Sequence, residues 1–385
     1  MVAGGRFGYT FVWAFVFAAV LKYFLTEALG RWHLATGRTI IEGWRAIGLW
    51  AVVFVGVYLV LWAFIYGAAG PATVGLAANA MVPALSVEAW AIVHSLAAFA
   101  IVLIGRYGVF ELIMKVLVGV MFVTVVGSAV IVGPDLAGFA RGLVPTIPAG
   151  SLLYAVGVVG GLGGTLALAA YGYWIRDKNW HGRSFIPLMR LDSVIGYVAT
   201  AIFALSMLVL GAEFLYGTDR SVEGDAGLLA LVEPLAQEHG VALKWLFLLG
   251  FWSVAYTSVL GVWNGMSYLF ADIVRTISDR TAKSDTPEGE RPNFERTRSY
   301  RLFLVMLTFP TIPLILLGRP VQLVLIWVTL GAIFLPFLAC TLLYLLNARR
   351  FGVRQGGIVS VSNIVLALSL LVFAVLLAQQ VVGLF

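Results

Sequence analysis

The chain has 385 residues, of which 61% are hydrophobic and 11% are charged, and its 25 Lys and Arg against 19 Asp and Glu give a net charge of +6. A soluble domain carries about 25% charged residues, so this chain has too little polar surface to cover a water-soluble globule. High apolar content without a repeat also excludes a collagen, a coiled coil and a disordered chain. The composition therefore predicts a polytopic membrane protein in a lipid bilayer, with no nucleic acid as a partner.

Long apolar segments recur along the chain, and a membrane-crossing helix needs about 20 such residues. The segments lack the alternation of barrel strands, so we predict an all-α fold with about ten transmembrane helices in a single domain, 1–385. The expected spans are 8–30, 46–69, 89–105, 109–133, 150–175, 190–216, 243–274, 299–317, 321–347 and 358–384. Residues 71–84 are apolar but too short to cross. We expect a re-entrant or surface helix there.

Positive charge alternates between successive loops. Most of the 25 Lys and Arg lie in the loops that follow the odd-numbered spans. The positive-inside rule places these loops in the cytoplasm, so both termini are expected outside a plasma (inner) membrane of bacterial type. An external N-terminus so close to the first span is an uncommon start. The simplest explanation is one more helix upstream of Met1.

The fifth span is the least regular, because glycines crowd its middle. Glycine costs about 1 kcal/mol per residue in a helix relative to alanine, so this helix is expected to unwind. Unwound backbone at membrane depth occurs where it is buried or lines a cavity, and its freed carbonyls can bind a cation. Close helix packing through small residues is the alternative. The candidate substrate-binding residues are Gly160, Gly161, Gly163, Gly164 and Thr165.

A few polar residues lie inside other spans, where ionisable groups are functional candidates. Asn264 in the seventh span either binds substrate or ties two helices together. Glu27 and His94 are candidates for a proton path, although Glu27 has the spacing for an ordinary ion pair with Arg31. A hydrogen-bonded core histidine is the alternative for His94. Lys22 has no partner at helical spacing, so it either pairs with another helix or extends to the membrane surface.

Soluble catalytic motifs are absent from the sequence. There is no Walker A motif, no GxSxG and no carboxylate pair near a histidine. A single cysteine, Cys340, and four scattered histidines exclude an intrachain disulfide, a cysteine-based zinc site and an iron–sulfur cluster. We therefore expect a protein that is not an enzyme and has no cofactor.

Three separated stretches carry a family resemblance, and they read FGYTFVWAFVFAAVLKYFLTEALGRWHLATGRTIIEGW, VLGVWNGMSYLFAD and LPFLACTLLYLLNARRFG. The first is similar to the second helix and following loop of the Nramp divalent-metal transporters. With the order of the other spans, the resemblance covers nearly the whole chain as helices two to eleven. It implies an inverted-repeat (LeuT-like) bundle of two five-helix halves, each with a broken first helix at the substrate.

Two departures from the family pattern bear on the metal. The family's opening helix, with its Asp-Pro-Gly-Asn metal motif, has no counterpart, so the resemblance implies a bundle that lacks its first helix. The family's Met-Pro-His motif is replaced by Gly163, Gly164 and Thr165, which leaves Thr165 as the candidate metal ligand. Without a soft thioether the case for Fe²⁺ or Mn²⁺ weakens, and a harder cation is better suited.

The resemblance implies a secondary-active transporter that carries a divalent metal cation by alternating access, with protons as the coupling ion. Two alternatives stay open. One is a transporter of the same fold for an organic solute such as an amino acid. The other is a truncated, non-transporting remnant or partner subunit.

Overall fold

The computed structural model describes residues 1–385 except 105–106, 219–230, 279–292, 318–319, 354–357 and 383–385. Within the described part every regular element is a helix. Eight helices there are long and apolar enough to cross a membrane, and shorter apolar stretches, Phe334–Asn347 and Val361–Val375, lie in two further helices. The predicted all-α, polytopic architecture is confirmed.

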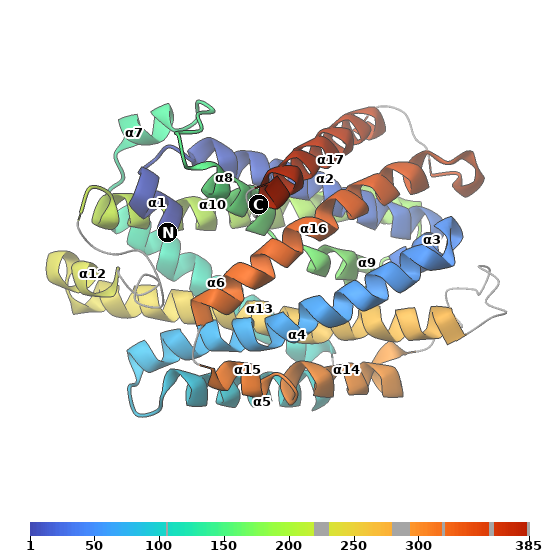
Figure 1. The fold of residues 1–385 in the computed structure, drawn as a ribbon, viewed down its shortest axis with the longest axis horizontal. Helices are drawn as coiled ribbons and strands as arrows, with labels where there is room; N and C mark the ends of the chain where they lie inside the picture. Colours follow the sequence, from blue (N-terminus) through green and yellow to red (C-terminus); the bar gives the residue numbers. More distant parts are fainter. Residues whose placement is uncertain (105–106, 219–230, 279–292, 318–319, 354–357, 383–385) are drawn as a thin grey trace.

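Long helices run across the length of the molecule, and short helices connect several of them (Figure 1). In chain order the elements are α1 (Val2–Phe7), α2 (Val12–Thr36), α3 (Ile40–Ile47), α4 (Leu49–Met81), α5 (Val87–Ile104), α6 (Tyr107–Val132), α7 (Leu136–Arg141), α8 (Leu152–Gly161), η1 (Leu166–Ala170), α9 (Tyr171–Asp177), η2 (Arg183–Phe185), α10 (Ile186–Leu215), α12 (Val232–His239), α13 (Val241–Ser278), η4 (Phe294–Arg296), α14 (Arg298–Thr308), α15 (Ile312–Leu316), α16 (Pro320–Asn347), η5 (Arg349–Phe351) and α17 (Ile358–Val382).

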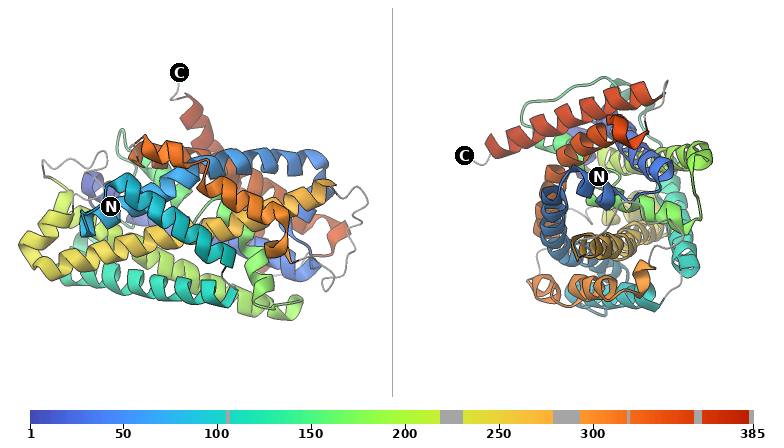
Figure 2. Two further views of the ribbon diagram at one scale, coloured as in Figure 1. Left: turned by 90° about the horizontal axis from the view of Figure 1, so that it is seen from below. Right: turned by 90° about the vertical axis from the view of Figure 1, so that its right-hand side faces the viewer.

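The centre of the bundle is α13, which packs against α4, α5, α6 and α14. The end-on view of Figure 2 shows α13 inside the bundle. On another side, α2 packs against α8, α10 and α17, and α16 joins this group to α4. Buried apolar side chains of these helices pack against one another. Van der Waals packing of this kind drives the association of helices in a membrane.

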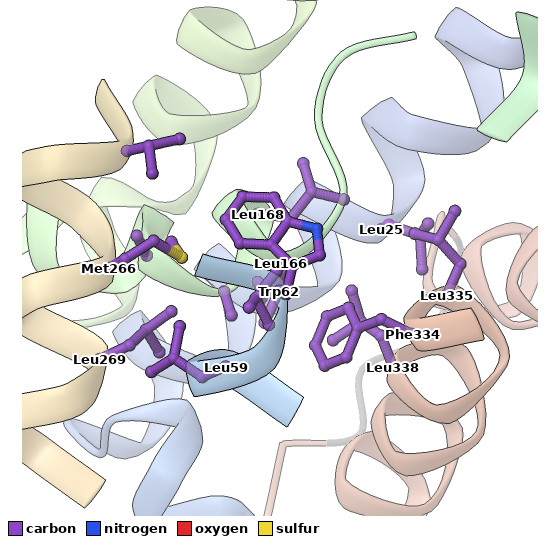
Figure 3. Packing of buried hydrophobic residues seen from close by; sticks show 14 of the residues in the cluster. Leu25, Leu59, Trp62, Leu166, Leu168, Met266, Leu269, Phe334, Leu335 and Leu338 are labelled. Atoms are coloured by element: carbon purple, nitrogen blue, oxygen red, sulfur yellow. The ribbon is translucent and has the colours of Figure 1, made fainter. Parts of the chain in front are cut away.

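The short segment η1 lies in the hydrophobic core. Leu166 of η1 belongs to one buried cluster with Leu25 of α2, Trp62 of α4, Met266 of α13 and Phe334 of α16 (Figure 3). Four helices therefore hold Leu166, the first residue of η1, in place after the end of α8. The backbone between α8 and η1 is fixed in place by this packing.

The expectation of a separate re-entrant helix at 71–84 is wrong, because α4 continues through Pro71 to Met81. The second half of α4 packs closely on α5. A Cβ added at Gly75 would lie 2.2 Å from the carbonyl oxygen of Val87. This close contact holds the helix together beyond the proline, whose missing N–H removes only one backbone hydrogen bond.

The expected span 299–317 is divided into α14 and α15 by three residues, 309–311. Pro310 lies in this interruption. A proline has no N–H to donate and disfavours helical geometry at the residue before it. The two short helices together still form one apolar candidate span, Arg298–Leu316.

Candidate functional site

The fifth predicted span is broken where the glycines predicted it to be. α8 ends at Gly161, and the next helical turn, η1, begins at Leu166. Gly163 and Gly164 have φ angles of +70° and +88°, in the left-handed region that side chains other than glycine rarely adopt. A Cβ at Gly163 would also lie 2.8 Å from the Tyr197 ring. The predicted unwinding is confirmed.

Thr165 places a buried hydroxyl at the end of the break. Its side chain is 3% exposed, and within the described part of the chain Oγ1 has no hydrogen-bond partner. The side chain packs against α16, where a Cβ added at Gly331 would lie 2.7 Å from the Thr165 methyl group and 3.0 Å from its hydroxyl. A buried hydroxyl without a partner costs about 1–3 kcal/mol. Thr165 Oγ1 is therefore a polar atom that a ligand would satisfy.

Two carbonyl oxygens of the break are already in use. Lys22 Nζ, from α2, donates a hydrogen bond of 3.0 Å to the Gly160 oxygen and a second to the Gly164 oxygen. Of the two alternatives predicted for Lys22, pairing with another helix is therefore the one observed, and the sequence carried no signal for which helix. Of the predicted carbonyl ligands, Gly160 and Gly164 thus already bind an ammonium group.

A cavity of about 540 Å³ reaches the break at Gly163 and extends between α2, α6, α9 and α10. Near the break, Thr26 Oγ1 and the Tyr197 hydroxyl are hydrogen-bonded at 2.7 Å. The cavity also borders an ion pair of 2.9 Å between Lys178 and Asp192. The cavity therefore extends from the unwound backbone at Gly163 to Lys178, at the end of α9, and Asp192, on α10.

Asn264 is engaged in contacts between helices. Its Oδ1 accepts a hydrogen bond of 2.9 Å from Trp174 Nε1 of α9, and its Nδ2 donates one of 3.3 Å to the Tyr300 hydroxyl of α14. The Asn264 side chain thus links α13 to α9 and α14, which fits the predicted alternative that it ties helices together. Its role in substrate binding stays a prediction.

Glu27 lies in a buried ion-pair network. Its side chain is 1% exposed and accepts a hydrogen bond of 3.1 Å from Arg31, so the predicted pair at helical spacing is confirmed. Arg190 of α10 adds a second guanidinium at 2.8 Å. Ser362 of α17 completes the group. The sequence showed no sign of the two partners from α10 and α17. Two guanidinium groups thus pair with this buried carboxyl group, and a proton-path role for Glu27 stays a prediction.

His94 uses both ring nitrogens. Trp252 Nε1 donates to His94 Nε2 at 3.0 Å. This assigns the proton to Nδ1, which donates to the Trp90 carbonyl at 2.7 Å. The ring also packs edge-on against Tyr256. This is the bonding of a neutral core histidine, and a proton-path role for His94 stays a prediction.

Within the described residues, no group of three or more His, Cys, Asp or Glu could hold a metal ion. The oxygen donors at the break are backbone carbonyls and the hydroxyl of Thr165. Such ligands suit a hard cation better than a soft transition metal.

Comparison with known proteins supplies the context of this site. A family model described as natural resistance-associated macrophage protein-like (Nramp) matches residues 1–385. The divalent metal cation transporter MntH of Chromohalobacter salexigens is 28% identical over 235 residues, or 57% of this chain and 53% of that protein. The match therefore spans about half the length of this curated relative.

Solved structures share the fold. A crystal structure of a mutant manganese transporter from Eremococcus coleocola has a TM-score of 0.73 at 16% identity and covers 100% of this chain and 83% of its own. The same transporter in complex with an aromatic bis-isothiourea compound has a TM-score of 0.69 at 15% identity, with the same coverage. At this identity the likeness establishes the fold, and it confirms the expected LeuT-like bundle.

Proposed function

This chain belongs to the Nramp family, and we propose that it is a secondary-active transporter that moves a divalent metal cation across a membrane by alternating access, with protons as the coupling ion. The family membership and the metal transport named for its relative support the substrate class. The relative matches over only about half its length, so the substrate comes to this chain as part of the proposal.

One observation in the structure carries the assignment of the site. The helix break brings the unpaired Thr165 hydroxyl and the backbone at Gly161 and Gly163 together beside the core. The cavity reaches the same break. We place the metal at the Thr165 side of the break, because Lys22 occupies the carbonyls of Gly160 and Gly164. An oxygen-only site predicts that Mg²⁺ competes with Mn²⁺.

Uptake of Mn²⁺ into liposomes that contain the purified protein tests this site. Thr165→Val removes the hydroxyl at constant shape and is expected to raise the half-saturating Mn²⁺ concentration by about tenfold, or ~1.4 kcal/mol. Thr200→Val is the matched control, because Thr200 lines the cavity that reaches the break at Gly163, while its hydroxyl donates a hydrogen bond to the Gly196 carbonyl. Equal uptake by Thr165→Val and the unaltered protein would contradict the site.

Proton coupling is tested separately in the same liposomes. An inward proton gradient is expected to accelerate Mn²⁺ uptake, and Mn²⁺ is expected to drive acidification of the lumen. Uptake that is indifferent to the gradient would refute the coupling while leaving metal transport intact.

The volume of the cavity favours an organic solute as a second candidate substrate. About 540 Å³ is far more than one dehydrated ion fills, and it lies in the range of small-molecule sites. Competition of Mn²⁺, Mg²⁺ and amino acids in one uptake assay separates the two substrates. A folded protein that transports none of them would favour the non-transporting alternative.

A further inference from the structure

Lys22 places an ionisable amine in a fully buried position within a transmembrane helix. Its side chain is 0% exposed, and among the described residues no carboxylate lies within ion-pair distance of it. An ionisable group inside the membrane is expensive unless it is paired. The partners of Lys22 are backbone carbonyls, and both belong to the break after α8.

These carbonyls form a site with negative potential. Gly160 is in the last turn of α8, where carbonyls lack partners within the helix and the helix dipole is negative. Gly164 lies in the unwound segment that follows. The amine has three N–H donors, and its nitrogen also lies 5.9 Å from the centre of the Phe373 ring. Two oxygens and an aromatic face together make a cage for a cation.

The cage is assembled from three helices. α2 supplies the lysine, α8 with the break supplies the oxygens, and α17 supplies the ring, and these three helices pack on one another (Figure 1). The stem of Lys22 passes directly beside the unwound backbone, since a Cβ at Gly163 would lie 3.7 Å from Lys22 Cβ. Lys22 therefore contacts the break both at the base of its side chain and at its nitrogen.

We propose that the Lys22 ammonium is a resident cation, which fills an oxygen cage at the helix break that would otherwise bind a free monovalent cation or a primary alkylammonium. Removal of the side chain turns the cage into a binding site for such an ion. The proposal goes beyond metal transport and stands whether or not the chain carries a metal. For a divalent ion, the charge of Lys22 leaves the Thr165 side of the break as the accessible part.

Chemical rescue of the full chain in detergent micelles tests the proposal. Lys22→Ala removes the atoms of an n-propylammonium group, so n-propylammonium chloride is the probe and 1-propanol at equal concentration is its neutral counterpart. Lys115→Ala is the matched control, because Lys115 is 69% exposed and pairs with Glu111 one turn away. The readout is the midpoint of thermal unfolding.

We expect Lys22→Ala to lower the midpoint by several degrees. n-Propylammonium should restore at least half of this loss in a concentration-dependent way, as specific binding requires. 1-Propanol should restore none of it, and the unaltered protein and Lys115→Ala should not respond. Equal responses of all three proteins, or rescue by the alcohol, would overturn the proposal.

A second variant decides the matter if Lys22→Ala does not fold. Lys22→Met keeps the length and volume of the side chain but has no charge and no donor. A purely packing role predicts that Lys22→Met unfolds at the same midpoint as the unaltered protein, and this result would overturn the proposal. A resident cation predicts a midpoint lower by several degrees, with Lys115→Met unchanged.

Discussion

Neutralisation of Glu27 is expected to destabilise this protein strongly. Glu27→Gln keeps the size of the side chain and removes its charge. The carboxylate is 1% exposed, and it is shared by Arg31 on its own helix and Arg190 on α10. Without it, two guanidinium groups would face each other across a neutral amide.

The magnitude follows from the burial of the two arginines. The Arg31 side chain is 0% exposed, whereas that of Arg190 is 23% exposed and can be hydrated. Loss of one partner of a buried pair costs about 3–5 kcal/mol, because the remaining charge stays uncompensated. The unfolding equilibrium constant should therefore rise by roughly 10²–10⁴-fold. Most of this effect comes from Arg31.

Unfolding by SDS in mixed micelles measures the effect. Glu111→Gln is the control, because Glu111 is 32% exposed and its pair with Lys115 at 3.0 Å is a surface pair. Such pairs contribute about 0–1 kcal/mol. Combining Glu27→Gln with Arg31→Met should recover part of the loss, since the most buried charge is then also removed.

The reasoning is refuted if Glu27→Gln is as stable as Glu111→Gln. A proton-path residue without a structural role predicts that pattern, together with loss of proton coupling in liposomes. A large loss of stability supports the ion-pair network instead.

Three further substitutions, with one control substitution, test other contacts, each by the same unfolding titration. Thr39→Ala removes the side chain that caps α3 and should cost about 1 kcal/mol, so an unchanged midpoint would contradict the capping box. Gly75→Ala should cost about 1–3 kcal/mol, because its Cβ would lie 2.2 Å from a carbonyl oxygen of α5. Gly119→Ala is the control for Gly75→Ala, because nothing lies within 4 Å of the added Cβ, and it should be neutral or stabilising. Equal changes in stability for the two variants would contradict the close contact at Gly75. Asn264→Leu should cost about 1–2 kcal/mol by leaving the half-buried indole N–H of Trp174 without its acceptor, and a neutral result would leave a role in substrate binding as the better explanation.

Features of the site that depend on neighbouring residues were predicted from the sequence, whereas those that depend on contacts between helices were not. The break between Gly161 and Thr165 was predictable, because helix propensity is a local property and glycines here lie close together. The Glu27–Arg31 pair was predictable from its spacing on one helix. The re-entrant helix at 71–84 was a wrong prediction, since it rested on the short length of this apolar segment, whereas α4 continues to Met81 and packs on α5.

The sequence by itself determined that this chain is an all-α membrane protein with a broken helix, because hydropathy and glycine content act within about 20 residues. Only the tertiary structure decided what the break contains. Lys22 lies 138 and 142 residues before the two carbonyl groups that it binds. Arg190 lies 163 residues beyond Glu27. A buried polar group takes the partner that helix packing brings to it, and that choice depends on how distant helices dock.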